Sequence, residues 1–393
     1  MPHPPSGLFT LLGVLSAFSP LAIDMYLSAF PQIERDLAAP AGSVQLTLSL
    51  FLLGLAVGQF VIGPVSDTLG RRVPLLLGCI GFGVTAWICG QATNIQTLVA
   101  ARFAMGFAGS AGLVVSRAIV RDLYDERESA GVYSFMMMVM GIAPVVAPLV
   151  GAQIIAWSDW RTVFWILAFI GWFSAAASAR ILSETLPYDR RTRFSVSAIF
   201  RRSFAILGNR QFVRSSLIIG GAAAALFGYI GTSPTLFIDD LGISPRWFSA
   251  IFASNAIGLF VAAQLNRWLL PKFGPRRLLH GAIQVATMIA GLFAICAATG
   301  WGGTFMIVTS VFGCVSILGL IFPNAIALAM GPFKSEAGAA SAVLGLIQYA
   351  LGATGGAIVG AVHNGTPVAM AAGILLCQIA NWIMAMGLAT ERQ

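Results

Sequence analysis

Charged residues are scarce in this chain of 393 residues, where they make up 10%, whereas about 25% is usual in soluble domains. The chain has 15 Asp and Glu, 23 Lys and Arg and three His, against a hydrophobic share of 58%. So few polar side chains cannot cover the surface of a water-facing globule. The composition excludes a soluble protein and indicates one that lies in a lipid bilayer.

Residue patterns for metal binding and nucleotide hydrolysis are also missing. The three histidines are far apart, and neither Lys272 nor Lys334 stands in a G-x-x-x-x-G-K sequence. The cysteines are odd in number, fall singly inside apolar runs and indicate packing; they are Cys79, Cys89, Cys296, Cys314 and Cys377. We therefore expect no disulfide framework, no metal site, no ATPase activity and no cofactor.

Apolar runs long enough to cross a bilayer recur along the whole chain. A spanning helix needs about 20 apolar residues, and the runs lack the alternating pattern of a membrane β-barrel. Twelve spans are predicted, at 8–31, 45–65, 74–92, 96–120, 130–156, 162–182, 214–237, 247–270, 278–299, 302–328, 338–362 and 367–389. The predicted fold class is an all-α membrane protein. The first run has no basic segment before it and no small-residue cleavage site after it, so we expect it to remain as a span rather than a secretory leader.

The positions of Lys and Arg predict the orientation of the spans, because positively charged loops stay in the cytoplasm. With a cytoplasmic N-terminus, 19 of the 23 basic residues fall on the cytoplasmic side, and the exceptions are Arg35, Arg102, Arg161 and Arg246. Both termini are then cytoplasmic. Since this bias accounts for the net charge of +8, a nucleic-acid partner is not expected.

The twelve spans divide into two halves of six. Residues 183–213 contain Glu184, Pro187 and several arginines, and they predict a cytoplasmic linker between bundles at 1–182 and 214–393. The halves repeat weakly at an offset of 205, as Arg71-Arg72 against Arg276-Arg277 and Gly151 against Gly356 show. Paired six-helix bundles of this kind are typical of secondary transporters that work by alternating access.

Two ionisable residues are predicted inside spans. Asp24 precedes the charged turn at 34–36 within the first span, and Arg102 lies in the fourth. Each is six or seven residues from the outer end of its helix, which places both about 10 Å below the outer surface. Intramembrane charges are costly and often functional. Proton or substrate coupling by Asp24 and Arg102, directly paired or through water, is the favoured interpretation; a static structural pair is the alternative.

Several motifs resemble those of the major facilitator superfamily. Gly63-Pro64-Val65-Ser66-Asp67-Thr68-Leu69-Gly70-Arg71-Arg72 is similar to the loop that follows the second helix in that family. The segment from Arg102 to Gly106 resembles a fourth-helix motif, although Met105 stands where Gln is common. The segment from Gly141 to Gly151, with Pro144 and Pro148, resembles the fifth-helix motif of drug–proton antiporters.

The first span and the start of the second resemble one branch of that family in particular. Ile23-Asp24-Met25-Tyr26-Leu27, followed by Phe30-Pro31 and Val44-Gln45-Leu46-Thr47, is similar to the bicyclomycin/chloramphenicol-resistance branch, with Ser28 in place of its usual Pro. The resemblance implies a bacterial inner-membrane exporter that exchanges protons for a drug-like molecule. Asp24 would take up the proton with Arg102 as its partner, Asp67, Arg71 and Arg72 would latch the outward-facing state, and the fifth-helix Gly and Pro residues would let that helix bend.

Candidate contacts to substrate are less specific, because each such residue can equally be part of the core. They mix aromatic, thioether and amide side chains, as a pocket for small amphiphiles requires: Tyr26, Gln45, Tyr133, Phe135, Met138, Tyr229, Phe252, Asn255, Asn324 and Tyr349. The expected partners are a small molecule, protons and lipid, and the protein is expected to be a monomer. A metabolite exporter of the same fold and a uniporter are the alternatives, whereas an intramembrane enzyme is disfavoured for want of a catalytic cluster.

Overall fold

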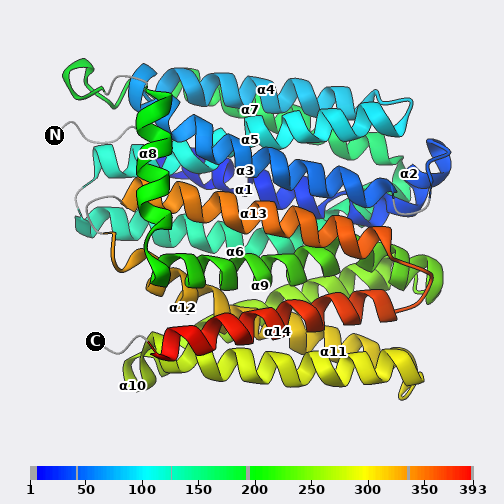
Figure 1. The fold of residues 1–393 in the computed structure, drawn as a ribbon. Coiled ribbons are helices and arrows are strands. Elements are labelled where there is room, and N and C mark those ends of the chain that lie inside the picture. The colour runs from blue at the N-terminus through cyan, green and yellow to red at the C-terminus, as the bar shows by residue number, and fades with distance from the viewer. Residues whose placement is uncertain (1–6, 41–42, 125, 192–194, 334–336, 391–393) are drawn as a thin grey trace. The chain divides into compact units, whose positions relative to one another are not determined.

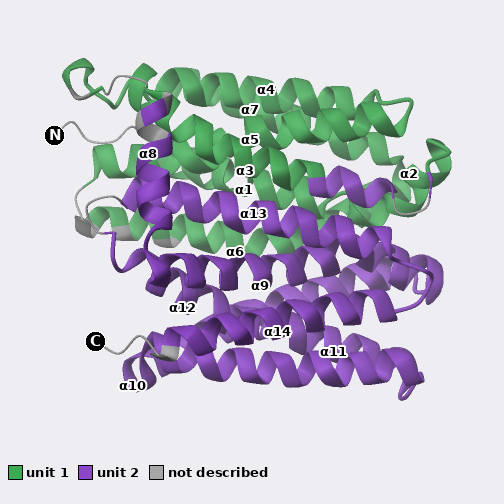
Figure 2. Cartoon of the chain, viewed as in Figure 1, with its two compact units in different colours: residues 1–39, 50–196 green, residues 40–49, 197–393 purple. Residues whose placement is uncertain are grey.

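The chain is helical throughout the residues that the computed structural model describes, which are 7–40, 43–124, 126–191, 195–333 and 337–390. It forms two compact units, one of residues 1–39 with 50–196 and one of residues 40–49 with 197–393 (Figures 1 and 2). Arg193, Lys334 and Arg392, three of the basic residues assigned to the cytoplasmic side, lie outside the described residues.

The first unit is built from the helices that begin before residue 196. Their bounds are α1 Leu8–Asp24, η1 Leu27–Ala29, α2 Phe30–Asp36, α3 Ser43–Leu69, α4 Arg72–Gly90, α5 Ile95–Leu123, α6 Glu126–Trp157, α7 Trp160–Ile181 and η2 Tyr188–Arg190. Within this unit α4 packs between α5 and α7, and α1 packs against α5 and α6. The division between the units falls inside α3, whose residues up to Ser49 group with the second unit.

The second unit contains the remaining helices. Their bounds are α8 Val196–Leu207, α9 Arg210–Pro234, η3 Thr235–Asp240, α10 Pro245–Thr299, α11 Gly303–Ser316, α12 Leu318–Met330, α13 Ala337–Ala361 and α14 Val368–Thr390. The helix α9 packs against α12, α13 and α14, and α10 packs against α11, α12 and α14.

Eleven helices in the described part of the chain are long and apolar enough to cross a membrane, where the sequence predicts twelve spans. The difference lies in α10, which joins the spans predicted at 247–270 and 278–299. At about 1.5 Å per residue its 55 residues cover about 80 Å, more than twice the hydrocarbon thickness of about 30 Å. Gly274, with φ 70° and ψ 162° between Pro271 and Pro275, breaks the helical conformation there. The helix α10 therefore contains both predicted spans, one on each side of Gly274.

The first span has an irregular turn within it, which the apolar runs do not predict. The span predicted at 8–31 ends its first helix at Asp24 and resumes at Phe30, where Pro31 occupies the first turn of α2. Proline has no N–H and suits a helix start. The span predicted at 302–328 is α11 followed by α12, and it stays helical between them, because Ile317 has φ −62° and ψ −22° and its N–H donates to the carbonyl oxygen of Gly313 at 3.1 Å. The first span is therefore irregular between Asp24 and Phe30, whereas the tenth is continuous.

Small residues let the helices of the first unit approach one another closely. A Cβ on Gly54 of α3 would overlap the carbonyl oxygen of Phe103 of α5, and a Cβ on Gly106 of α5 would overlap that of Phe51. In lipid no hydrophobic force drives helices together, so such close packing is a main source of their association. These contacts hold α3 and α5 in register beside Arg102.

Side-chain caps define where several helices begin. Asn94, Asp159 and Asn209 each accept a hydrogen bond from a backbone N–H three residues on, at 2.8, 3.2 and 2.9 Å. A polar cap of this kind satisfies one of the free N–H groups of a first helical turn. The caps of α5 and α7 both lie at the predicted outer ends of their spans, and that of α9, Asn209, lies near the end of the predicted linker.

Candidate functional site

Asp24 is the last residue of α1 and is 4% exposed. Its position depends on two glycines in neighbouring helices. A Cβ on Gly112 of α5 would lie 2.8 Å from the carbonyl oxygen of Leu15, and one on Gly151 of α6 would overlap that of Met25. Because the backbone of α1 rests directly on α5 and α6, the carboxyl group of Asp24 is fixed in the interior of the first unit.

Arg102 is fully buried on α5 and lies in a cage of aromatic rings. Its guanidinium carbon is 4.4 Å from the ring centre of Tyr26, 4.2 Å from that of Phe51 and 5.8 Å from that of Phe164. The faces of aromatic rings attract a cation, by about 2 kcal/mol where water is excluded. Rings from α3, from α7 and from the turn after α1 thus stabilise the charge of Arg102 inside the protein.

The polar atoms of Arg102 are only partly satisfied. Its Nη1 donates to the sulfur of Met105 at 3.5 Å, and its Nε and Nη2 are buried without a hydrogen-bond partner. Among the described ion pairs, whose N···O distances are within 4.0 Å, there is none between Arg102 and Asp24. Of the arrangements that the sequence allowed, the direct pair is therefore not formed here, and two donors of Arg102 remain available.

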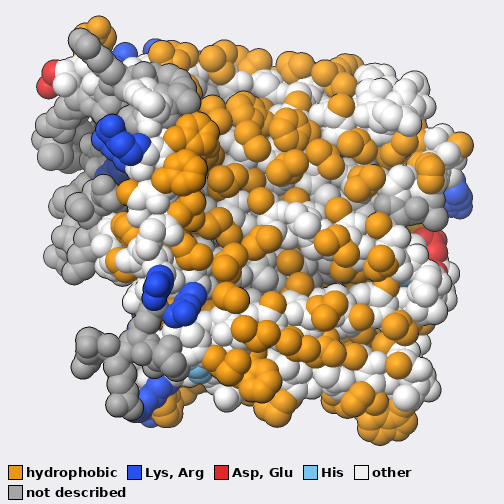
Figure 3. Space-filling model, viewed as in Figure 1, with side chains coloured by type: hydrophobic (Ala, Val, Ile, Leu, Met, Phe, Trp, Pro, Cys, Tyr) orange, Lys and Arg blue, Asp and Glu red, His pale blue; other side chains and the backbone are white. Residues whose placement is uncertain are grey.

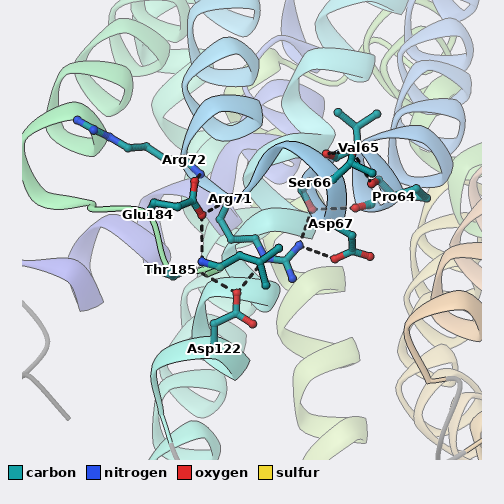
Figure 4. Close-up of polar contacts among 12 residues, drawn as sticks. Pro64, Val65, Ser66, Asp67, Arg71, Arg72, Asp122, Glu184 and Thr185 are labelled. Carbon is teal, nitrogen blue, oxygen red and sulfur yellow. Dashed lines mark hydrogen bonds and ion pairs between the residues drawn. The ribbon is translucent and has the colours of Figure 1, made fainter. Parts of the chain in front are cut away.

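A second polar group surrounds Arg71 at the turn between α3 and α4 (Figure 4). Its Nε donates to Asp122 at 2.9 Å, and its Nη1 donates to Asp67 at 2.5 Å and to Ser66 at 3.0 Å. Partial burial on its own lowers the pKa of Arg71, but the hydrogen bonds and charges of Asp122 and Asp67 outweigh it and raise that pKa above its ordinary value. The side chain is a permanent cation that joins α3 to α5.

Glu184, which follows α7, closes the same turn from the other side. Its carboxylate accepts from the backbone N–H groups of Arg71 at 2.8 Å, Arg72 at 3.3 Å and Leu186 at 3.0 Å. Gly70 lies beneath it with φ 92°, and a Cβ there would overlap the carboxylate. Partial burial raises the pKa of Glu184, but the three N–H donors and the charge of Arg191 together lower it below its ordinary value.

Arg72 points to the end of α7. Its Nη2 donates to the carbonyl oxygen of Ala179 at 2.8 Å, in the last turn of that helix. A cation at a helix C-terminus satisfies free carbonyls and matches the helix dipole. Of the predicted loop residues, Asp67, Gly70, Arg71 and Arg72 therefore join one network, whereas Gly63 lies one helical turn earlier and accepts a hydrogen bond from Ser66 through its carbonyl oxygen.

The sequence reasoning missed two carboxylates of this network, Asp122 and Glu184. Both stand near helix ends that are predicted to be cytoplasmic, in a chain that has only 15 Asp and Glu. Because carboxylates are rare here and the loops on that predicted side are basic, each was a candidate partner for Arg71. The aromatic partners Phe51 and Phe164 of Arg102 gave no such signal, because the chain contains 27 Phe.

The fifth-helix motif lies in α6, which continues through Pro144 and Pro148. Of its glycines, Gly151 makes the close contact with Met25 described above, whereas Gly141 is partly exposed. The motif thus contributes a close approach between α6 and the end of α1, next to Asp24.

Three of the predicted substrate-binding residues lie together in the second unit. Asn255 of α10 donates through its Nδ2 to the hydroxyl of Tyr229 of α9 at 2.7 Å, and the rings of Tyr229 and Phe252 stack with centres 5.8 Å apart. All three are buried, and Asn255 Oδ1 has no hydrogen-bond partner. The group offers aromatic surface beside one free acceptor.

The remaining candidates of the second unit have separate surroundings. Gln45 donates to Thr235 at 3.1 Å, and Asn324 donates to Asn266 at 2.5 Å. The ring of Tyr349 lies 6.3 Å from that of Phe227. Gln45 and Asn324 thus link α3 with η3 and α12 with α10.

The candidates of the first unit differ in their contacts, and Tyr133, Phe135 and Met138 lie within two turns of α6 whereas Tyr26 lies beside Arg102. Tyr133 donates to the carbonyl oxygen of Arg117 at 3.0 Å. The ring of Phe135 lies against Gly13 of α1, whereas Met138 is 49% exposed. The ten predicted residues therefore do not form a single group within either unit.

Comparison with known proteins places these features in a family. Residues 12–357 match the family described as Major Facilitator Superfamily. The chain is 36% identical over 403 residues to an uncharacterised transporter, YdgK, of Bacillus subtilis, with 100% of this chain and 99% of the relative covered. It is 29% identical to a bicyclomycin resistance protein homologue of Haemophilus influenzae, with 91% and 90% covered. It is 30% identical to the multidrug resistance protein MdtL of Citrobacter koseri, with 84% and 82% covered.

Solved structures show the same fold at low sequence identity. The nucleoside transporter NupG has a TM-score of 0.71 and 16% identity, with 98% of this chain and 100% of that chain covered. An inward-facing bacterial homologue of the lysosomal transporter Spinster has a TM-score of 0.70 and 17% identity, with 98% and 95% covered.

Proposed function

Since the chain belongs to the Major Facilitator Superfamily and is a multi-pass membrane transporter rather than an enzyme, we propose that it is a proton-coupled antiporter. It exports small amphiphilic, drug-like molecules across the bacterial cytoplasmic membrane. The names of two relatives, a bicyclomycin resistance protein homologue and a multidrug resistance protein, support this direction and class of transport.

The observation that carries the proposal is the burial of Asp24 without an ion pair to Arg102. A carboxylate in a dry interior without a cation beside it is costly, whereas the protonated acid is not. Asp24 is buried, and Arg102 is held by aromatic rings instead of by Asp24. The geometry suits a site that is neutral in the closed interior and loses its proton when the site opens to the cytoplasm.

Arg102 supports the coupling because its charge is stabilised independently of Asp24. Two of its nitrogen atoms have no hydrogen-bond partner, so the guanidinium can approach a carboxylate or bind water when the helices move. Proton binding and substrate binding are coupled only as far as each favours a different conformation. The broken first span, which ends α1 at Asp24, provides the backbone at which such a change can occur.

Substrate contacts are proposed at Tyr229, Phe252 and Asn255 within the second unit and, separately, at Tyr26 within the first. Stacked rings next to a free amide acceptor suit a molecule with apolar surface and a hydroxyl or amide donor. One buried acid and one arginine give no excess of negative charge, so neutral or zwitterionic substrates fit better than dications.

The proposal is tested by export of chloramphenicol and bicyclomycin from efflux-deficient bacteria that express the wild-type protein or Asp24→Asn. We expect low accumulation only in energised cells with the wild-type protein, and high accumulation with Asp24→Asn or after a protonophore. Asp189→Asn, in the exposed turn η2, is the matched control and should export normally.

Two results would contradict the proposal. Full export by an Asp24→Asn protein that is present at normal levels removes Asp24 from the coupling. If both proteins are present and cells with either one accumulate the two compounds equally, the substrate is instead a metabolite of the cell.

A further inference from the structure

The predicted outer end of the first unit contains a carboxylate that does not suit its own helix. Asp36 is the last residue of α2, and the carbonyl end of a helix disfavours negative charge. Its Oδ2 instead accepts a hydrogen bond from Trp160 Nε1 at 3.0 Å and lies 3.6 Å from Arg161 Nη1. Both partners stand in the first turn of α7. The contact with α7 therefore accounts for a charge at this position.

Arg161 joins the same group to a third part of the chain. Its Nη2 donates to the carbonyl oxygen of Ala92, in the turn after α4, at 3.2 Å, and its guanidinium carbon lies 4.3 Å from the ring centre of Trp160. Arginine suits this position, because its planar group stacks on a ring and donates in several directions. We call Asp36, Trp160 and Arg161 the outer clasp, which ties α2 and the turn after α4 to the start of α7.

The segment that the outer clasp holds is the continuation of the chain beyond Asp24, which is 4% exposed. This segment consists of the irregular turn and α2. Its large apolar side chains are fully buried, namely Tyr26, Leu27, Phe30 and Ile33. In Figure 3, charged side chains lie at the end of the structure where Figure 1 labels α2, and hydrophobic side chains cover the helices beside it. In the predicted orientation the segment therefore separates the carboxyl group of Asp24 from the water outside.

Aromatic contacts continue from the outer clasp to Arg102. Trp160 is fully buried, and its ring meets that of Phe164 edge to face, with centres 5.9 Å apart. Phe164 follows one turn later on α7, and its ring centre lies 5.6 Å from that of Tyr26. Both of these rings belong to the cage around Arg102. Because protein interiors are close-packed, a shift of Trp160 must also move Phe164.

We propose that Asp36, Trp160 and Arg161 are positioning residues of the proton site. They close the turn after Asp24 to water on the outer side, and they hold Phe164 against Arg102. Release of the outer clasp lets α2 move away from α7 and admits a proton from that water to Asp24. The link to the proton rests on the proposed function, whereas the closure of the turn depends on neither the substrate nor the coupling.

The test measures closure of the turn as the reaction rate of a cysteine within it toward a membrane-impermeant maleimide. Ser28 lies in η1 and is 5% exposed, so Ser28→Cys places the thiol inside the closed segment. Ser158→Cys, in the exposed turn before α7, shows from which side of the membrane the reagent must be added. Cys377 is replaced by Ala in the full-length protein, because it is the native cysteine that is only partly buried.

The outer clasp is opened by Asp36→Asn, which removes the charge, or by Trp160→Phe, which keeps a ring but lacks the Nε1–H donor. Arg35→Gln is the matched control, because Arg35 is exposed on the same helix and its Nε donates to Pro31 of α2 itself. Asp36→Glu keeps the carboxylate and tests for rescue.

We expect Ser28→Cys to react far more slowly than Ser158→Cys. Asp36→Asn and Trp160→Phe should raise its rate several-fold, Asp36→Glu should raise it less, and Arg35→Gln should leave it unchanged. Rapid reaction at position 28 with the outer clasp intact would overturn the proposal, and so would a rate that the clasp substitutions do not change. An equal rise in proteins that keep Ser28 would overturn it too, because general unfolding would then expose the native cysteines.

A water-soluble carbodiimide, which modifies protonated carboxyl groups, measures access to Asp24 itself. Asp36→Asn and Trp160→Phe should increase modification of the peptide that contains Asp24, as read by mass spectrometry, whereas Arg35→Gln should not. Faster maleimide labelling at position 28 without this increase would overturn the assignment to the proton site. Neither reaction requires a substrate, so a failure of the proposed export leaves both results as they are.

Discussion

Arg102 illustrates how a charge is kept inside a membrane protein without a counter-ion. The rings of Tyr26, Phe51 and Phe164 replace part of its hydration, and a thioether accepts one of its hydrogen bonds. A structural cation would be expected to have a committed carboxylate, because an unpaired buried charge is expensive. The arrangement therefore points to a residue that is retained for what it does during transport.

Replacing Arg102 by Leu distinguishes a structural role of Arg102 from a role in transport. Leu removes the charge but fills much of the cage, so we expect the melting temperature to stay unchanged or rise, because no unpaired charge remains buried. Export should lose its dependence on the proton gradient. Arg102→Lys keeps the charge but loses the planar group that stacks on the rings, and it should restore coupling only in part. Thermal unfolding and export from everted vesicles at several pH values measure the two effects. A large fall in melting temperature with normal pH dependence would assign Arg102 a purely structural role.

Glu184 gives a prediction about stability and pH. Its folded-state pKa lies below the ordinary value of 4.5, so its ionised form stabilises the folded protein above about pH 4.5 and this contribution is lost as the pH falls below it. Glu184→Gln leaves one acceptor oxygen where the carboxylate has two, at a cost of about 1 kcal/mol, or about 2–4 °C in melting temperature.

Thermal unfolding in detergent at pH 7 and pH 4 measures this difference. The gap between Glu184→Gln and the wild-type protein should be present at pH 7 and shrink at pH 4. Asp189→Asn, in the same exposed segment, should match the wild type at both values. A gap that is equal at both pH values would show that the charge of Glu184 is not what holds the turn.

At the residue scale the sequence was informative where a residue type is rare. Asp24 stands out because the rest of its predicted span is uncharged, and Arg102 because it lies well inside its span, whereas Arg117 lies near the end of it; the structure buries both Asp24 and Arg102. Their partners are common residue types, whose contacts depend on the rotation of each helix about its axis. A single sequence does not contain that rotation, so the aromatic cage was not foreseeable.

At the scale of elements, the contact between α6 and the end of α1 yields a test. A Cβ on Gly151 would overlap the carbonyl oxygen of Met25, so Gly151→Ala must push α6 away from the turn that follows Asp24. Overpacking of this kind typically costs about 1–3 kcal/mol. We expect a lower melting temperature and a loss of export.

The same helix offers the control for this substitution. Gly131 is exposed on α6, and a Cβ there meets no atom within 4 Å. Gly131→Ala should therefore leave stability and export unchanged. Normal export by Gly151→Ala would show that the close approach beside Asp24 is not needed for the transport cycle.

The spans themselves were predictable, because their length is imposed by the bilayer. Their interruptions were not, since each depends on a local conformation. The first span stops at Asp24 and resumes at a helix start that contains Pro31, and the eighth and ninth spans join at Gly274, whose φ of 70° favours glycine. Proline and glycine positions indicate where a break is possible, but 43 Gly and 18 Pro in the chain leave too many candidates.

At the scale of the whole molecule, the distribution of charge determines how the protein lies in the membrane. The 23 Lys and Arg outnumber the 15 Asp and Glu, and their concentration in alternate loops favours one orientation. The network around Arg71 lies at the helix ends that are predicted to face the cytoplasm, whereas Asp24 is predicted nearer the outer end of its span.

This orientation predicts which turns a membrane-impermeant maleimide can reach. Ser158 is exposed in the turn between α6 and α7, predicted to be outside, and Asp189 is exposed after α7, predicted to be inside. Ser158→Cys should react in intact spheroplasts and Asp189→Cys only in inverted vesicles. The native cysteines should add little background, because four are buried and Cys377, the fifth, can be replaced by Ala. The opposite pattern would invert the topology and place the Arg71 network on the outer side. This labelling therefore tests the orientation that the basic loops predict without knowledge of the substrate.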